Sequence, residues 1–192
     1  MELLDAIYHR RAVREFLDEA IPRDSILKLI DAAIQAPSAM NLQPWSFAVV
    51  EDRAALKKIS DRAKAHLLET IPPDSPLARM HDELANPNFD IFYRAPLLIV
   101  ICVRSGASTA DFEAGDCALA AENLMLAAHG MGFGTCWIGL SAAWLNTSKG
   151  KSELGIPAGY RAVAPIIVGK PKSFPPSHGR QPPEIFWHPK KS

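Results

Sequence analysis

An unbroken apolar run from Pro96 to Val103 is the feature that most constrains how this chain of 192 residues can fold. The run is far too short to span a bilayer, so it predicts a strand of a soluble protein. A strand that is apolar at every position has to be covered on both of its faces. We therefore expect a central strand here, inside a sheet with both faces covered.

Periodic apolar residues predict further elements on either side of that strand. Ile26, Leu29 and Ala33 follow the spacing of one helical face, which Pro37 brings to an end. Residues 71–87 are proline-bearing and weakly periodic, and we interpret them as a loop with one short helix and as a candidate lid. Helices are expected around residues 3–10, 24–36, 53–68 and 111–129, and strands at residues 46–50 and 162–168.

Composition excludes several classes of protein. Lys plus Arg and Asp plus Glu both total 21, so no net charge attracts nucleic acid or an anionic membrane. The N-terminal residues 1–14 lack a long apolar core and do not resemble a secretory signal. Three cysteines (Cys102, Cys117 and Cys136) suggest neither a disulfide framework nor a zinc site, and the six histidines show no metal-ligand spacing. These features predict a reduced, cytoplasmic protein without a metal.

The C-terminal segment, residues 171–192, has a different composition from the rest. It holds six prolines in 22 residues, and also the large apolar residues Ile185, Phe186 and Trp187. A proline-rich tail cannot build a core of its own, so these residues need another surface to cover. We expect a single domain over residues 1–192, with residues 171–192 as an arm that packs on a partner subunit.

Arg10, Arg11 and Arg14 gather cations at the end of the first expected helix. Cations at a helix C-terminus stabilise it by about 0.3–1 kcal/mol, so a purely local role would explain the cluster. A phosphate would instead draw two or three of these donors to one point, and arginine suits bidentate contact. The cluster alone leaves both roles open.

The segment from Ala36 to Trp45 is a stiff polar loop between a periodic helix and a strand. Two prolines restrict its backbone, and Ser38, Asn41 and Gln43 carry side chains that can form hydrogen bonds. An ordinary helix-to-strand connection is one interpretation; a wall along the edge of an aromatic cofactor is the other. A stiff polar loop together with an anion-binding corner suits a phosphorylated aromatic cofactor.

Two later segments extend this pattern. One is Gly134-Thr135-Cys136-Trp137-Ile138-Gly139, which is equally compatible with a buried turn; the other is Gly169-Lys170-Pro171 followed by His178-Gly179-Arg180. Together with the arginines and the motif Pro-Ser-x-x-Asn-x-Gln-Pro-Trp, they resemble the nitroreductase family of flavin mononucleotide (FMN) enzymes, in the family's order. The resemblance extends from Ala6 to Trp187.

This resemblance implies an α+β, three-layer fold with a mainly antiparallel sheet flanked by helices, in an obligate, domain-swapped homodimer with FMN sites built from both subunits. It implies three groups of cofactor-binding residues. Those at the phosphate and ribityl chain are Arg10, Arg11, Ala12, Arg14 and Arg180; those supplied by the partner are Pro37, Ser38, Ala39 and Asn41; those facing the ring are Trp137, Ile138 and Gly139. Ala12 and Ala39 depart from the family pattern, because a hydroxyl residue is common at both positions.

The resemblance also implies an FMN-dependent oxidoreductase that uses NADH or NADPH. Hydride would pass through the flavin, by ping-pong kinetics, to a small-molecule acceptor such as a nitroaromatic or a quinone. No side chain need act as a chemical catalyst, since the cofactor carries the chemistry. Cys136 is more consistent with a small buried residue than with a nucleophile. Two alternatives stay open: a flavin enzyme for enone reduction, dehalogenation or substrate oxidation, and a non-catalytic FMN-binding protein.

Overall fold

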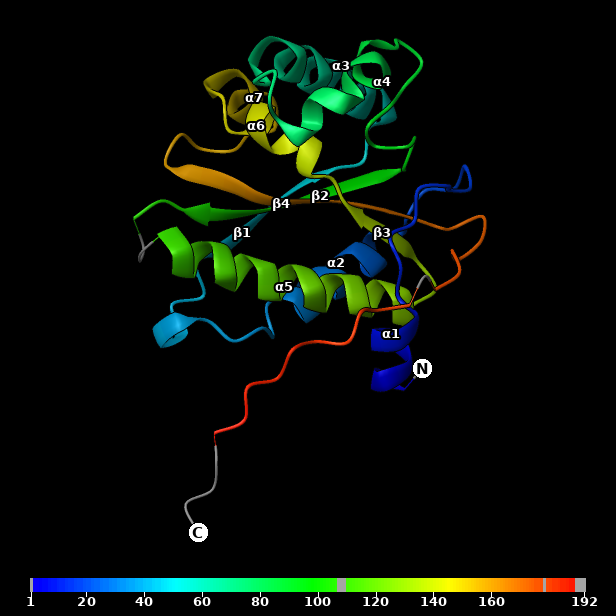
Figure 1. Ribbon diagram of the computed structural model, residues 1–192, viewed down its shortest axis with the longest axis vertical. Coiled ribbons are helices and arrows are strands. Elements are labelled where there is room, and N and C mark those ends of the chain that lie inside the picture. Colours follow the sequence, from blue (N-terminus) through cyan, green and yellow to red (C-terminus); the bar gives the residue numbers. More distant parts are fainter. Residues whose placement is uncertain (1, 107–109, 178, 189–192) are drawn as a thin grey trace.

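A four-stranded antiparallel sheet lies in the middle of the molecule, with helices on both faces (Figure 1). The computed structural model describes residues 2–106, 110–177 and 179–188. The spatial order of the strands is β1-β2-β4-β3. Their bounds are β1 Trp45–Val50, β2 Leu97–Arg104, β3 Gly134–Trp137 and β4 Tyr160–Gly169. The α+β, three-layer architecture expected from the sequence is confirmed.

Strand β2 is the predicted central strand, and its alternating side chains separate two cores. Leu98, Val100 and Cys102 point to one cluster of buried residues. Leu97, Ile99 and Ile101 point to the other. Successive side chains of a strand face opposite sides of the sheet, so a strand buried on both sides is apolar at every position.

The helices divide between the two faces of the sheet. One face is covered by α2 (Arg23–Ala33) and α5 (Ala110–Gly130), which pack against each other. The other is covered mainly by α3 (Arg53–Thr70) together with shorter helices. These shorter helices are α4 His81–Ala85, α6 Ala142–Leu145 and α7 Ser148–Glu153, with the 3₁₀ turns η2 Pro76–Met80 and η3 Gly139–Ser141.

Three features differ from the sequence-based expectations. Residues 134–137, for which a buried turn was one of two interpretations, form strand β3, paired with β4. Helices α6 and α7 were not expected. The helix α1 (Leu3–His9) forms as predicted, but its apolar face, Leu3, Leu4 and Ile7, is exposed. The periodicity of α1 is therefore real, yet Ala6 is its buried residue and the apolar face stays largely exposed.

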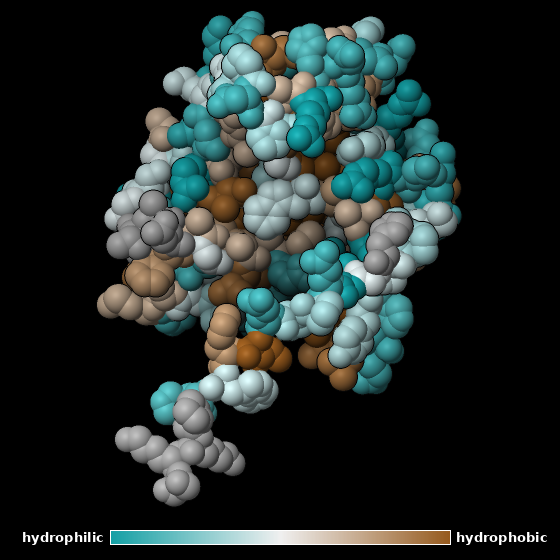
Figure 2. Space-filling model, in the orientation of Figure 1, coloured by the Kyte–Doolittle hydropathy of each residue, from teal (hydrophilic) through white to brown (hydrophobic). Residues whose placement is uncertain are grey.

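Besides those of α1, exposed apolar side chains lie on α5 and on the C-terminal tail. Phe112 and Leu119 lie exposed on α5, and Ile185, Phe186 and Trp187 lie exposed on the C-terminal tail. The tail leaves the body of the protein as an extended strand of chain without helix or sheet over the described residues 181–188 (Figure 1). Figure 2 shows apolar side chains at the surface in the lower half of the molecule, where Figure 1 places α1, α5 and the tail. Over residues 181–188 the tail therefore covers no core of its own chain, whereas Phe174 still packs against His129.

Candidate functional site

The arginine segment is held in place by β3. Ala12 forms a parallel bridge with Thr135, and the Val13 N–H donates to the Thr135 carbonyl at 2.9 Å. The approach is close, because a Cβ atom added at Gly134 would lie 2.7 Å from the Cβ of Val13. A glycine at this position lets the segment lie directly against the strand. Arg11 and Arg14 are thereby fixed beside the end of β3.

Arg11, Ala12 and Arg14 line a cavity of about 470 Å³. Prolines and a serine of the residues after β4 form its other wall; they are Ser173, Pro175 and Pro176. The guanidinium of Arg11 donates to the Arg10 carbonyl and to the Ser177 hydroxyl. Its Nε is buried and has no hydrogen-bond partner among the described residues. A buried donor without a partner in a cavity with two arginines fits the phosphate of FMN.

Two other arginines expected at the phosphate, Arg10 and Arg180, do not line this cavity. Arg10 donates from Nε to Glu122 of α5 at 3.3 Å. Arg180 is exposed and donates to the carbonyl of its neighbour Gly179. His178, part of the same closing motif, lies outside the described residues. Arg11 and Arg14 line the cavity, whereas Arg10 and Arg180 are not among the residues that line it.

A second cavity, of about 600 Å³, begins on the other side of Arg14. Trp137, Ile138 and Gly139, the residues expected to face the flavin ring, all line it. Leu77 and Met80 of η2 line it as well, so the segment expected to act as a lid does reach this cavity. Its other walls are mostly apolar. The arrangement suits a flat, largely apolar ring system.

Tyr93 is a residue of this cavity that sequence reasoning missed. The guanidinium carbon of Arg14 lies 5.8 Å from the centre of the Tyr93 ring, within the range of a cation–π contact. Tyr93 adopts a left-handed backbone with φ of 53°, which is uncommon for a bulky residue and tends to occur at functional sites. No sequence motif marks Tyr93, because its position depends on the turn that follows α4.

Burial is the main cause of the shifted pKa values of two groups that line this cavity. It raises the pKa of the Tyr93 hydroxyl, an effect that the charge of Arg14 partly opposes. Burial likewise raises the pKa of the Cys136 thiol. A thiol with a raised pKa is a poor nucleophile, which agrees with the structural role expected for Cys136. Over the described ranges, no group of three or more His, Cys, Asp or Glu side chains could hold a metal ion.

The stiff polar loop is well ordered by its own hydrogen bonds. The Ala39 N–H donates to the buried carboxylate of Asp116 on α5, at 3.1 Å. The Ser38 hydroxyl accepts from the Gln43 N–H, and the Gln43 side chain donates to Asn41. Met40, Asn41 and Gln43 all have positive φ, and η1 (Ala39–Asn41) forms the tip of the loop. This compact shape goes beyond an ordinary connection between a helix and a strand.

The loop and the arginine segment lie toward opposite ends of α5. Figure 1 shows η1 in light blue near the start of α5, while the dark blue segment after α1 runs near its end. One chain therefore does not bring Pro37, Ser38, Ala39 and Asn41 to the arginines.

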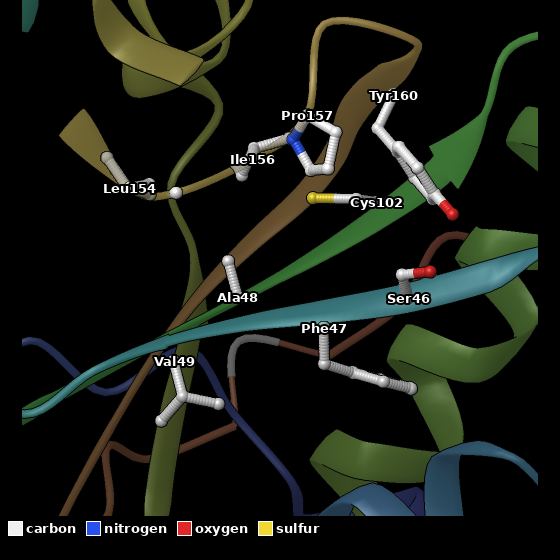
Figure 3. Close-up of a pocket in the computed structure, with 10 residues that line it drawn as sticks. Ser46, Phe47, Ala48, Val49, Cys102, Leu154, Ile156, Pro157 and Tyr160 are labelled. Carbon is white, nitrogen blue, oxygen red and sulfur yellow. The ribbon is translucent and has the colours of Figure 1, made fainter. Parts of the chain in front are cut away.

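A further cavity lies at the edge strand β1 (Figure 3). It has a volume of about 410 Å³, and Figure 3 shows Cys102, Ile156 and Tyr160 around it. None of the residues that line it is charged. Burial raises the pKa of the Cys102 thiol to about 11, so the sulfur stays protonated at neutral pH. This cavity lacks a cation such as Arg14, which lines both of the cavities described above.

The fold of this chain is similar to that of α+β proteins whose structures have been solved. A nitroreductase with bound FMN from Desulfitobacterium hafniense DCB-2 superposes with a TM-score of 0.82, covering 97% of this chain and 98% of that one, at 24% identity. The likeness to that structure concerns the fold alone. In the described parts of the chain, no helix is both long enough and apolar enough to cross a membrane.

Sequence comparison narrows the class to a family. Residues 7–170 match the model of the nitroreductase family, and the chain belongs to that family. A protein of Archaeoglobus fulgidus, provisionally named NADH dehydrogenase/NAD(P)H nitroreductase, is 32% identical over 89% of this chain and 86% of its own length. One of Methanothermobacter thermautotrophicus with the same provisional name is 34% identical over 73% of this chain, and the match spans 62% of that relative's length.

Proposed function

We propose that this protein is an FMN-dependent oxidoreductase that takes electrons from NADH or NADPH and passes them to a small acceptor. The observation that carries the proposal is the position of Arg14. It lines both the cavity with a buried unpaired guanidinium nitrogen and the apolar cavity beside β3. A cofactor with a phosphate at one end and a flat ring at the other needs two such cavities side by side. Membership of the nitroreductase family supports the assignment of that cofactor as FMN.

The residues of the chain would bind and polarise the cofactor rather than react with it. Bound FMN would supply the hydride chemistry. Arg11 and Arg14 would hold its phosphate through charge-assisted hydrogen bonds. Among the ring-facing residues, the Ile138 N–H already donates to the Pro165 carbonyl at 2.8 Å, whereas the Gly139 N–H has no backbone partner within the described parts. Gly139 is therefore the donor available to stabilise negative charge on a reduced ring.

The acceptor and the nucleotide would use one pocket in turn, giving ping-pong kinetics. Leu77 and Met80 line the ring cavity on one side, and most of its other walls are apolar. A flat apolar acceptor, such as a nitroaromatic or a quinone, matches this lining. No described side chain in the cavity is required as a proton donor for hydride transfer itself.

The complete site would require a homodimer. The polar loop lies at the opposite end of α5 from the arginines, and α1 and α5 both expose apolar faces. Two copies packed along these helices in opposite directions would bring the loop of one subunit to the arginines of the other. Pro37, Ser38, Ala39 and Asn41 would then come from the partner, and residues 171–192 would pack on it as an arm. Residues 1–192 would form one domain, in the cytoplasm.

The absorption spectrum of the purified protein tests this function. We expect a flavin spectrum that bleaches when NADH or NADPH is added without oxygen. A bleached spectrum that recovers on adding a quinone or a nitroaromatic would agree with both half-reactions. A flavin spectrum that neither nucleotide changes would favour a non-catalytic FMN-binding protein. A colourless protein that does not bind added FMN would refute the proposal.

A further inference from the structure

A cationic cavity lies on the far side of the turn that holds Tyr93. It has a volume of about 350 Å³, and Arg53, Lys57, Asp90 and Arg94 are its charged residues. The first two come from the start of α3, and the others come from the turn between α4 and β2. Asp18 and Asp61, which do not line the cavity, pair with Arg53 and Lys57, so Arg94 is the cation left to attract an anion.

The turn itself separates this cavity from the ring cavity. Ile91 and Tyr93 line the ring cavity, while Asp90 and Arg94, each one residue away, line the cationic one. The Asp90 carboxylate accepts from the backbone N–H groups of Phe92 at 2.9 Å and of Arg94 at 3.2 Å. These two bonds hold the turn in place and fix the Asp90 carboxylate against its backbone.

Arg94 is the cation best placed to bind a ligand. It makes no ion pair with any residue that the structure describes, whereas Arg53 pairs with Asp18 at 2.7 Å and Lys57 pairs with Asp61. Its backbone is left-handed, with φ of 56°, and its carbonyl accepts from Arg53 at 3.2 Å. Arg94 is exposed, so a ligand that enters the cavity can reach its guanidinium without breaking an ion pair.

We propose that this cavity binds the 2′-phosphate of NADPH, with Arg94 as the principal contact. The inference rests on the proposed function, because it places the nicotinamide of the same nucleotide in the ring cavity on the other side of the turn. NADPH differs from NADH only by that phosphate, and arginine accommodates a 2′-phosphate well. The protein therefore prefers NADPH over NADH as its electron donor.

Steady-state kinetics of the FMN-loaded protein test this preference. The quantity to compare is the ratio of kcat/KM for NADPH to kcat/KM for NADH. We expect the ratio to exceed one in the wild type and to fall about 10-fold to 100-fold in Arg94→Asn, the loss expected for one hydrogen bond to a charged group. Asparagine tolerates the left-handed backbone, so the turn is preserved. Arg94→Lys should keep most of the ratio.

Lys58→Ala is the matched control, because Lys58 is an exposed cation of the same helix and does not line the cavity. Its ratio should equal that of the wild type. A wild type that prefers NADH, or an Arg94→Asn variant with an unchanged ratio, would overturn the proposal.

Binding of adenosine 2′,5′-bisphosphate, measured by calorimetry, separates this inference from the proposed function. We expect it to bind more tightly than adenosine 5′-monophosphate, and Arg94→Asn to abolish the difference. If neither nucleotide reduces the protein, the proposed function fails, and calorimetry still decides whether the cavity selects the 2′-phosphate. Equal binding of the two adenosine ligands to the wild type would refute the site.

Discussion

Arg14 occupies the wall between two cavities, so its side chain can contact a cofactor in either. Its guanidinium lies over the ring of Tyr93, which is itself held by the turn around Asp90. The backbone nearby is fixed by the pairing of Ala12 and Val13 with Thr135. The side chain is thereby restrained before any ligand arrives, which reduces the entropy lost on binding.

The substitution Arg14→Ala should weaken FMN binding. Loss of a charge-assisted hydrogen bond to the phosphate corresponds to roughly 1.5–3 kcal/mol, or about a 10-fold to 100-fold higher Kd. Titration of the apoprotein with FMN, followed by flavin fluorescence, measures the change. Arg104→Ala removes an exposed arginine at the end of β2 and should leave the Kd unchanged. An equal Kd for Arg14→Ala and the wild type would contradict the role given to Arg14.

Single residues of the site were predictable where a motif marks them. Arg11, Arg14 and the stretch from Trp137 to Gly139 do line the two cavities as the sequence indicates. Tyr93 and Arg94 could not be predicted, since their left-handed backbones depend on hydrogen bonds to Asp90 that appear only in the folded turn. Whether each residue contacts FMN stays a prediction until it is measured.

At the scale of elements, the pairing of the arginine segment with β3 depends on a missing side chain. In Gly134→Ala the new Cβ would lie 2.7 Å from that of Val13, so the segment would have to move. We expect a loss of about 1–3 kcal/mol in the free energy of unfolding, measured by urea denaturation. The control is Gly159→Ala, where nothing lies within 4 Å of the added atom. Equal stabilities of the two variants would show that the segment adapts freely.

His129, near the end of α5, should make stability depend on pH. Its ring is buried against Phe174, and both ring nitrogens lack hydrogen-bond partners among the described residues. Burial lowers its pKa below 6.5, and the nearby charges of Arg10, His9 and Arg11 lower it further. Above pH 6.5 the ring is neutral in both folded and unfolded chains. Below that pH the unfolded chain binds a proton that the folded chain does not, so stability falls.

The loss should continue until the pH passes the lowered pKa of the folded protein. Urea midpoints measured between pH 7.5 and pH 5 should therefore fall more steeply in the wild type than in His129→Leu. A slope that is identical in the wild type and in His129→Leu would exclude a contribution from His129.

Long periodic elements were predictable, and short ones were not. The helices α2, α3 and α5 and the strands β1, β2 and β4 lie close to their expected positions, because each repeats its pattern over several residues. Strand β3 has only four residues and follows a glycine-rich stretch, so local sequence suggests a turn; its pairing with β4 and Ala12 decides its structure. Helices α6 and α7 are similarly short and depend on tertiary packing.

For the whole molecule, the apolar run at residues 96–103 predicts a sheet with two covered faces, and the family resemblance adds that the sheet is mainly antiparallel. Apolar side chains of α1, α5 and the tail lie outside this core. These side chains remain exposed, as the partner expected from the sequence would require. The proposed dimer explains why the apolar side chains Leu3, Leu4 and Ile7 of α1 stay exposed in a single chain. It also explains why α5 is apolar on more than one side.

Removal of the tail tests the proposed arm. A chain that ends before Gln181 loses Ile185, Phe186 and Trp187, which are exposed and unpacked within their own chain. We expect the truncated protein to dissociate at higher concentration than the full chain in sedimentation experiments, with an unchanged far-ultraviolet circular dichroism spectrum. Replacing Ile185 alone with serine should have a smaller effect in the same direction. A truncated protein as strongly dimeric as the full chain would exclude the arm.

The separation of the polar loop and the arginine segment along α5 has a thermodynamic consequence. A cofactor that touches both can be held fully only by two associated chains, so cofactor affinity and subunit affinity become linked quantities. Diluting the protein below its dissociation constant should release flavin, and adding flavin should draw separated subunits together. The yellow colour of the protein would then report its state of assembly.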